Sequence, residues 1–545
     1  MKKTAKSFPC IAKFILWVMI LCGLLAANET LVAQNASRAA SAPKSTSTAR
    51  VLQVGTYQGK AGAFSSIQAA VNAARPGDWI LIGPGDYHEQ GSSQAGVWVT
   101  TPGLHLRGMD RNGVVVDGTL PGSSRCSADP AAQDFGPGLA GRNGIEIYKA
   151  DGVSVENLTV CNFMGDAYAN NGNQIWWNGG DGTGHIGLGR YYGAFLTASS
   201  TFYQSGTPNV AQYGIFISNS KGPGSVLFSY ASNMGDSAFY IGGCPDCNAL
   251  LRFVHAQNSP QGYSGSNSGG HLVIEDSEWD QNQSGIVPSS LASYDPPSPQ
   301  DGACPEEPGK SCTLIQRNFV HDNNNPNTPG SGLAATAVVG SGIDLSGGRH
   351  NTVRNNLVIN NGSWGILLND YPDTSPVLGS TYCDGGIIGY KTPPPFDQLY
   401  GTVVPCFFHS YGNHVERNWF DHNGFFGNDT NGDLANAAIG YRTNNCFRGN
   451  VDLGKNKATS SPSNLQDPDV AGICGKPWKP DTNQEFSLID QLGCASLGPA
   501  SGACAGLSGP LYPLPTQVQF LPIPREPGMD DPCDGVPENS WCDER

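Results

Sequence analysis

The sequence predicts an all-β fold: a single-stranded right-handed parallel β-helix (solenoid) with an N-terminal capping helix and a disulfide-rich C-terminal extension. The first observation is a repeat, in which strand-like runs end on asparagine and Asn233, Asn258 and Asn282 lie 25 and 24 residues apart. The second is that each unit holds two or three short alternating strands and no helix. The third is the composition, because 71 glycines, 39 prolines and only 14% charged residues are typical of a turn-rich chain.

A unit of about two dozen residues matches one rung of a β-helix. An antiparallel sandwich or a propeller is the alternative, although a propeller blade needs roughly 40–45 residues. In a β-helix, inward side chains stack from rung to rung at about 4.8 Å. An asparagine that recurs at one turn can then form a ladder of side-chain hydrogen bonds and tolerates a left-handed backbone.

The first 33 residues are typical of a secretory signal peptide, with four lysines before an apolar run from Phe14 to Ala27 and small residues near Ala33. The run is short for a membrane span, so we expect a secreted or periplasmic monomer without membrane insertion. Residues 34–50 are expected to form a disordered linker. Without residues 1–33, 27 basic and 45 acidic side chains remain, a net charge of −18, which argues against nucleic acid as a partner.

The solenoid is expected to begin under a capping helix at residues 64–75, in the stretch FSSIQAAVNAARPGDWILIGPGDYHE (64–89). Ser65 and Gln68 fit a capping box, and the apolar residues that follow share one helical face. An open first rung exposes apolar side chains and unpaired backbone groups, so the helix is predicted to cover it. Polar residues of the next turns are expected to solvate this cap rather than form a site: Asp78, Asp86, His88 and Glu89.

The repeats are expected to extend over residues 51–450, with insertions at about 288–312, 324–340 and 370–411. After residue 450 the repeat is lost, and residues 451–545 are predicted to form a Pro- and Cys-rich cover and tail.

An even number of cysteines in an exported chain favours disulfides over metal thiolates. Cys244 and Cys247 are expected to bridge a rung corner, with a redox-active pair as the alternative. Two further pairs each flank one insertion and are candidates to close it: Cys304 with Cys312, and Cys383 with Cys406.

The stretch SSIQAAVNAARPGDWILIGPGDYHE resembles the start of exported pectate-lyase-like β-helix proteins, which share the pattern S-I-Q-x-A-[VI]-x-A-A-x-P-G-D-x-[IV]-x-[IV]-x-P-G-x-Y-x-E. The segment from Met234 to Ser290, with GDSAFYIGGCPDC and GIVPSS, is similar to a bacterial group of right-handed parallel β-helix repeat proteins. The resemblance covers roughly residues 51–450 and implies the fold. It implies no single activity, because related members include lyases, hydrolases, esterases, epimerases and non-catalytic surface proteins.

Signatures of individual enzymes are incomplete. Gly85, Tyr87 and Glu89 match the start of pectin methylesterases, whose later aspartate motifs are missing from the sequence. The motif set of polygalacturonases and the Asp-Pro-His of alginate epimerases are missing as well. The expected function is therefore to bind and cleave or modify a polysaccharide, as a lyase or a glycoside hydrolase. A non-catalytic carbohydrate-binding or cell-surface structural protein is the alternative.

In a Gly-Ile-x-Ile-x strand the apolar residues point inward and the x residues outward. Threading the rungs on this pattern gives an outer row of Glu146, Phe195, Phe216, Tyr240, Ser264, Val287, Asp344 and Leu367. Exposed aromatic rings would form a platform for sugar rings. The predicted substrate-binding residues are therefore Glu146, Phe195, Phe216 and Tyr240 of this row, together with Asn369 of the neighbouring row, beside Asp370. The alternative is that loops 119–142, 168–190 and 288–312 fold over the row and bury it.

Asp344 and Asp370 are the predicted catalytic residues, because they lie on consecutive rungs. Glu146 and Asp344 are about six rungs, or about 29 Å, apart, too far for the roughly 5–9.5 Å of a glycosidase pair. A close carboxylate pair raises the pKa of one member for acid–base work and would also bind calcium. The alternative is that both are turn-forming aspartates in contact with solvent.

A second polar group precedes the recurring asparagines: Asp280, His321, Asp322, Asp421 and His422. Histidine suits proton transfer near neutral pH. Because these positions recur with the turn, a solvated ladder edge is the favoured interpretation.

Overall fold

The computed structural model describes residues 49–166, 170–204, 209–290, 312–373, 406–438, 445–463, 465–467 and 482–542. The predicted signal peptide, nearly all of the predicted linker and the cysteines Cys304, Cys383 and Cys474 lie outside these residues. Among the described helices, none combines the length and the apolar character needed to cross a membrane.

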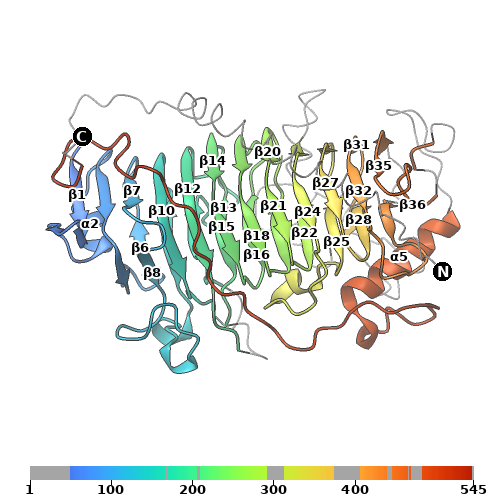
Figure 1. The fold of residues 1–545 in the computed structure, drawn as a ribbon, viewed down its shortest axis with the longest axis horizontal. Helices are drawn as coiled ribbons and strands as arrows, with labels where there is room; N and C mark the ends of the chain where they lie inside the picture. Colours follow the sequence, from blue (N-terminus) through green and yellow to red (C-terminus); the bar gives the residue numbers. More distant parts are fainter. Residues whose placement is uncertain are drawn as a thin grey trace, which may run out of the picture. The chain divides into compact units, whose positions relative to one another are not determined.

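Three ladders of short parallel strands make up the β-helix (Figure 1). The first ladder contains β6 (Ala95–Val99), β9 (Asn143–Tyr148), β11 (Ile175–Asn178), β13 (Tyr213–Ser218), β16 (Ser237–Gly242), β19 (Gln261–Ser266), β22 (Ser284–Ser289), β25 (Ser341–Ser346), β28 (Trp364–Asn369), β33 (Gly432–Ala437) and β36 (Ser460–Ser461). The second contains β1 (Val51–Val54), β4 (Trp79–Ile82), β7 (His105–Gly108), β10 (Val153–Cys161), β12 (Tyr191–Ser199), β14 (Gly224–Leu227), β17 (Ala249–Arg252), β20 (Leu272–Glu275), β23 (Thr313–Gln316), β26 (Thr352–Arg354), β31 (His414–Glu416) and β34 (Cys446–Arg448). The third contains β5 (Gly85–Tyr87), β8 (Val114–Asp117), the ends of β10 and β12, β15 (Tyr230–Ser232), β18 (His255–Gln257), β21 (Glu278–Asp280), β24 (Phe319–His321), β27 (Leu357–Ile359), β32 (Trp419–Asp421) and β35 (Val451–Asp452).

Pairing within the three ladders is parallel throughout, which confirms the β-helix and excludes the antiparallel alternatives. Antiparallel pairing among the described strands is confined to two small hairpins, β2 (Thr56–Tyr57) with β3 (Lys60–Ala61) and β29 (Tyr371–Asp373) with β30 (Cys406–Phe408). Inward apolar side chains from all rungs form one continuous core. Along the first ladder, for example, Ile145, Ile175 and Ile215 stack in register and are fully buried.

Helix α2 (Ile67–Ala73) lies at the β1 end of the helix stack, as predicted for a cap (Figure 1). Its N-cap is Ser66, one residue later than the predicted Ser65, and the Ser66 Oγ accepts a hydrogen bond from the Ala69 amide. The predicted capping box is wrong, because the Gln68 side chain instead bonds the backbone of Trp98 in β6. Glu89 does the capping: its carboxylate accepts hydrogen bonds from the amides of Ile67 and Gln68.

Asparagine side chains form three buried ladders, one at each corner of the coil. Each Nδ2 donates to the Oδ1 of the next asparagine at 2.9–3.2 Å. The three sets are Asn282, Asn323, Asn361 and Asn423; Asn318, Asn356, Asn418 and Asn450; and Asn351, Asn413 and Asn445. Asn233 and Asn258 lie one position before the ladder position, at the left-handed residue of the corner. The predicted spacing of Asn233, Asn258 and Asn282 therefore combined two different structural positions.

The C-terminal segment packs on the last rungs of the β-helix and then runs back toward the first rungs. Helix α5 (Thr482–Leu497) packs its Leu488, Ile489 and Ala495 against β28 and β33. The following chain runs back toward β1 across the strands (Figure 1). Short 3-10 helices complete the described structure: η1 (Pro130–Ala132), η2 (Pro137–Leu139), η4 (Gly332–Thr336) and η5 (Pro499–Ser501).

Four disulfides join described cysteines. Cys244 and Cys247 are bonded, which confirms the predicted corner bridge. Cys312 is also oxidised, but its predicted partner Cys304 lies outside the described residues. The other three bridges are Cys126–Cys161, Cys494–Cys504 and Cys533–Cys542.

Candidate functional site

The outer row of the first ladder follows the predicted threading over most of its length. Backbone pairing places each member over the next. From β6 to β33 the row consists of Trp98, Glu146, Trp176, Phe216, Tyr240, Ser264, Val287, Asp344, Leu367 and Ala435. The predicted Glu146, Phe216, Tyr240 and Asp344 therefore share one row.

Phe195 does not belong to this row, so that prediction is wrong. It lies in β12, at a left-handed bend between the second and third ladders, and its ring stacks on Phe228 at 4.9 Å. Trp176 takes its place opposite Glu146, because β11 forms a rung within a stretch that the sequence pattern assigned to a loop. The missed signal is Ile175-Trp176-Trp177, in which the outer residue is aromatic and both flanking residues are buried.

Aromatic side chains gather on the N-terminal half of this face. We call them the aromatic strip: Trp98, Tyr148, Trp176, Tyr213, Phe216 and Tyr240. The rings form two contacting sets. In one, the centroids of Trp98 and Tyr148 are 5.2 Å apart. In the other, Phe216 lies 5.0 Å from Trp176, 4.3 Å from Tyr213 and 4.8 Å from Tyr240. All but the buried Tyr240 are partly exposed. The strip is thus an apolar surface that water reaches and that the core does not use.

Glu146 lies inside the aromatic strip, between Trp98 and Trp176 in register. Only 3% of its surface is exposed. Its two oxygens accept hydrogen bonds from Asn143 at 2.7 Å and from Asn178 at 2.9 Å. Burial raises the pKa of the Glu146 carboxyl above its ordinary value, against the lowering effect of these two amides. A buried carboxyl group with a raised pKa is therefore held next to the partly exposed rings.

Asp344 lies further along the same row, between Val287 and Leu367, and is 4% exposed. Its Oδ1 is buried and has no hydrogen-bond partner among the described residues. Burial raises the pKa of Asp344 to about 7. The residue is therefore a carboxylic acid at mildly acidic pH rather than the solvated turn residue of the alternative interpretation.

Asp370 follows β28 and lies on the rung next to Asp344, as predicted. Asp344 is opposite Leu367, however, so Asp370 is three positions further along the strand, about 10 Å at 3.3 Å per residue. Its carboxylate accepts a hydrogen bond from the Ser410 amide at 2.8 Å and contacts His409 Nδ1 at 2.9 Å. Asp370 is thus half of a carboxylate–imidazole pair.

The C-terminal part of the row is covered. Leu367 and Ala435 pack under α5 and are fully buried, so the cover at this point comes from the C-terminal segment. The nearby Asn369 is 7% exposed and exchanges hydrogen bonds with the Ser346 hydroxyl. Its predicted contact with substrate stays a prediction.

On the third ladder, the structure brings together only part of the second predicted group. Asp280, His321 and Asp322 lie close to one another, joined by His255 and Glu278, which the sequence pattern did not select. Asp421 and His422 lie elsewhere on the ladder: Asp421 is opposite Ile359, and His422 bonds the side chain of Asn360.

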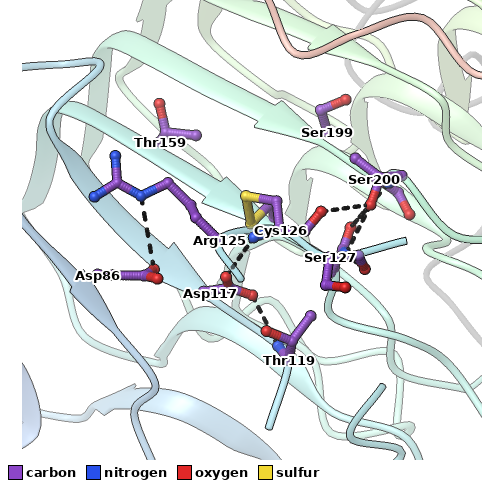
Figure 2. The surroundings of a disulfide bond; sticks show 12 residues. Asp86, Asp117, Thr119, Arg125, Cys126, Ser127, Thr159, Ser199 and Ser200 are labelled. Atoms are coloured by element: carbon purple, nitrogen blue, oxygen red, sulfur yellow. Dashed lines mark hydrogen bonds and ion pairs between the residues drawn. A yellow bond between two sulfur atoms is a disulfide. The ribbon is translucent and has the colours of Figure 1, made fainter. Parts of the chain in front are cut away.

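Near the cap, Asp86, His88 and Asp117 also converge. Figure 2 shows Asp117 beside Cys126, which is disulfide-bonded to Cys161, and Asp86 facing Arg125. Asp117 accepts hydrogen bonds from the Thr119 and Cys126 amides. The Asp117 carboxylate therefore holds the loop after β8 against the β-helix.

No protein-family model matches the sequence, and no curated protein matches it. Several solved structures are similar in fold. The A-module of the mannuronan C-5 epimerase AlgE6 of Azotobacter vinelandii is 13% identical over 71% of this chain and 96% of its own, with a TM-score of 0.37. An alginate lyase of Paenibacillus sp. FPU-7 is 11% identical over 74% and 95%, with a TM-score of 0.32. The tailspike protein of E. coli bacteriophage HK620, a double mutant in complex with a pentasaccharide, is 11% identical over 71% and 61%, with a TM-score of 0.37.

The parallel pairing within the three ladders by itself shows that the chain is a parallel β-helix.

Proposed function

We propose that the protein is an exported polysaccharide-binding protein and that the aromatic strip is its binding surface. The observation that carries this proposal is the series of partly exposed rings on consecutive rungs, Trp98, Trp176 and Phe216 among them. Exposed apolar patches on a soluble surface mark binding sites, and aromatic faces offer large contact areas with polar edges. Because the rings repeat along the stack, the surface suits a polymer rather than a single sugar.

Export is supported by the predicted signal peptide and by the disulfides, which persist in oxidising compartments.

We further propose that the bound chain is cleaved or modified near Asp344 and Asp370. The raised pKa of Asp344 suits a general acid near neutral pH. Asp370 holds Nδ1 of His409, an arrangement that orients an imidazole for use as a base. Glu146 is six rungs from Asp344, so its role is in binding within the strip.

Binding is tested with a panel of neutral and acidic polysaccharides in affinity gel electrophoresis and calorimetry. Replacing Trp176 and Phe216 together by alanine is expected to weaken binding at least about tenfold, since each removes a stacked ring worth roughly 1 kcal/mol or more. Phe228→Ala is the matched control, because Phe228 is an exposed stacked ring outside the strip. Equal losses in both variants, or no binding to any polymer, would contradict the proposal.

Activity is tested by following unsaturated products in the ultraviolet and new reducing ends. Asp344→Asn is expected to abolish either signal while leaving binding intact. Binding by the strip without any product would favour the alternative of a non-catalytic surface protein. Full activity in Asp344→Asn would remove the catalytic assignment but not the binding one.

A further inference from the structure

Four chemically reactive side chains meet on the outer face of the third ladder, away from the aromatic strip. They come from three neighbouring rungs: His255 in β18, Glu278 and Asp280 in β21, and His321 in β24. Backbone pairing sets His255 opposite Glu278, and Asp280 opposite His321. The two histidines therefore flank a pair of carboxylates from below and above.

Three members of this group, His255, Glu278 and Asp280, have ligand atoms close enough to share one ion, and His321 contacts them through Glu278. His255 Nε2 is 2.6 Å from Asp280 Oδ1, and His321 Nε2 is 3.0 Å from Glu278 Oε1. One atom each from His255, Glu278 and Asp280 lies within 4.8 Å of the others. Donors on a tetrahedral metal at about 2.0–2.2 Å are separated by comparable distances.

The surrounding residues orient these donors as outer-shell residues do around a metal. Asp322 Oδ2 is 2.8 Å from Nδ1 of His321, which directs Nε2 toward the carboxylates. Gln257 and Gln281 both donate to Oδ2 of Asp280, leaving Oδ1 toward His255. A histidine that binds a metal almost always donates its other ring N–H to a carboxylate or carbonyl.

The group is also reachable from solvent. The side chains of Glu278 and His255 are 45% and 31% exposed, while that of Asp280 is 6% exposed.

We propose that His255, Glu278, Asp280 and His321 form a binding site for a divalent transition-metal ion, with zinc as the best fit. Two imidazoles and two carboxylates are donors that zinc prefers, whereas calcium prefers an all-oxygen shell. The ion takes the place of the proton that His321 Nε2 shares with Glu278, and that proton goes to solvent. A bound ion would cross-link three rungs at a face that the proposed polysaccharide site does not use.

The test uses the mature chain without an affinity tag, stripped with a chelator and titrated with zinc in a calorimeter. One zinc per chain is expected, and cobalt at the same site should give visible bands of low-symmetry nitrogen and oxygen coordination. His255→Ala and His321→Ala should each weaken zinc binding at least about tenfold. His271→Ala is the matched control, because His271 forms an exposed pair with Asp246 at 2.8 Å outside the group.

Asp322→Asn tests the orienting contact, and a loss of about 10- to 100-fold in zinc affinity is expected. Unfolding temperatures of the metal-free variants distinguish lost binding from lost folding. The proposal fails if the wild-type chain binds no zinc, if the double variant lacking both histidines binds it equally well, or if calcium displaces zinc. The first result would make the group a set of ion pairs in which protonated His321 bridges Glu278 and Asp322.

Discussion

At the scale of single residues, the β-helix contains left-handed backbone conformations and a buried carboxyl group, both of which are unfavourable by themselves. Phe195, Phe228 and Phe253 adopt left-handed φ values of 53°, 50° and 55° at the bend between the second and third ladders. Such a conformation costs a non-glycine residue about 1–2 kcal/mol. Their rings stack on one another at 4.9 Å, so rung-to-rung contact offsets the local cost.

Asp344 shows the same principle for charge, because the first ladder buries it without a described partner for Oδ1. Its pKa is about 7 in the folded protein, against 3.8 ordinarily. The unfolded chain therefore loses this proton first, and stability falls as pH rises from about 4 to about 7, then stays low. An asparagine side chain at this position cannot ionise, so Asp344→Asn should match the wild type near pH 4 and exceed its stability at pH 8, by up to about 4 kcal/mol.

Thermal unfolding midpoints at pH 4 and pH 8 check this expectation. Asp429→Asn, at an exposed position, serves as the control and should show no comparable gain. A difference between Asp344→Asn and the wild type that is the same at both pH values would show that ionisation of Asp344 is not its cause.

At the scale of elements, asparagine side chains join neighbouring rungs at the corners through ladders of hydrogen bonds. In the middle of one ladder, Asn356 accepts hydrogen bonds from Asn318 and donates to Asn418 and to the backbone carbonyl of Ile315. All four groups are buried, so a missing partner cannot be replaced by water.

Asn356→Ala is expected to lower the free energy of unfolding by about 3 kcal/mol, because it leaves buried donors and acceptors unpaired. Asn72→Ala, on the exposed side of α2, should change it by less than about 1 kcal/mol. Denaturant unfolding of both variants measures the difference. Equal effects would mean that the corner ladders add little stability.

The rung, the cap and the inward–outward alternation were predictable, because they follow from a period and from hydrophobicity. Errors arose where a local pattern has two solutions. Asn258 and Asn282 look equivalent in sequence, yet one is the left-handed corner residue and the other the ladder residue. Phe195 fits an outer position, and only pairing across rungs shows that Trp176 holds it.

The position of the candidate site residues on one outer row could be predicted from the sequence, whereas the residues that pack around them could not. Asp344 follows from alternation within its strand. The cover of Leu367 by α5 depends on a segment more than a hundred residues later in the chain, and the meeting of His255 with Asp280 depends on rung register. Contacts of this kind join residues far apart in the sequence and depend on the three-dimensional register of the rungs, so the local sequence pattern does not predict them.

At the scale of the whole β-helix, the C-terminal tail acts as a strap. It meets the rungs in reverse order of the sequence, through polar side chains at the corners. Gln519 bonds Asn258, Leu521 bonds Asn233, and Met529 bonds Asn157. The tail thus satisfies the side chains of left-handed corner asparagines while it crosses the strands (Figure 1).

The strap ends on the first rungs, where Trp541 is 4% exposed and packs with Leu81 and Met109. Its indole N–H donates to the carbonyl of Lys60 at 3.0 Å. Trp541→Ala should therefore cost about 3 kcal/mol, as expected for a buried aromatic residue, and the loss should be local because each rung contacts only its neighbours.

Hydrogen–deuterium exchange tests the location of that loss. In Trp541→Ala, amides of β1, β4 and β7 should exchange faster, while those of β25 and β28 keep their protection. Trp419→Ala, which removes an indole that is 44% exposed in β32, should leave the first rungs unchanged. Faster exchange spread evenly over all rungs would mean that the β-helix unfolds as one cooperative unit, and unchanged exchange at β1 would mean that the strap does not secure the first rung.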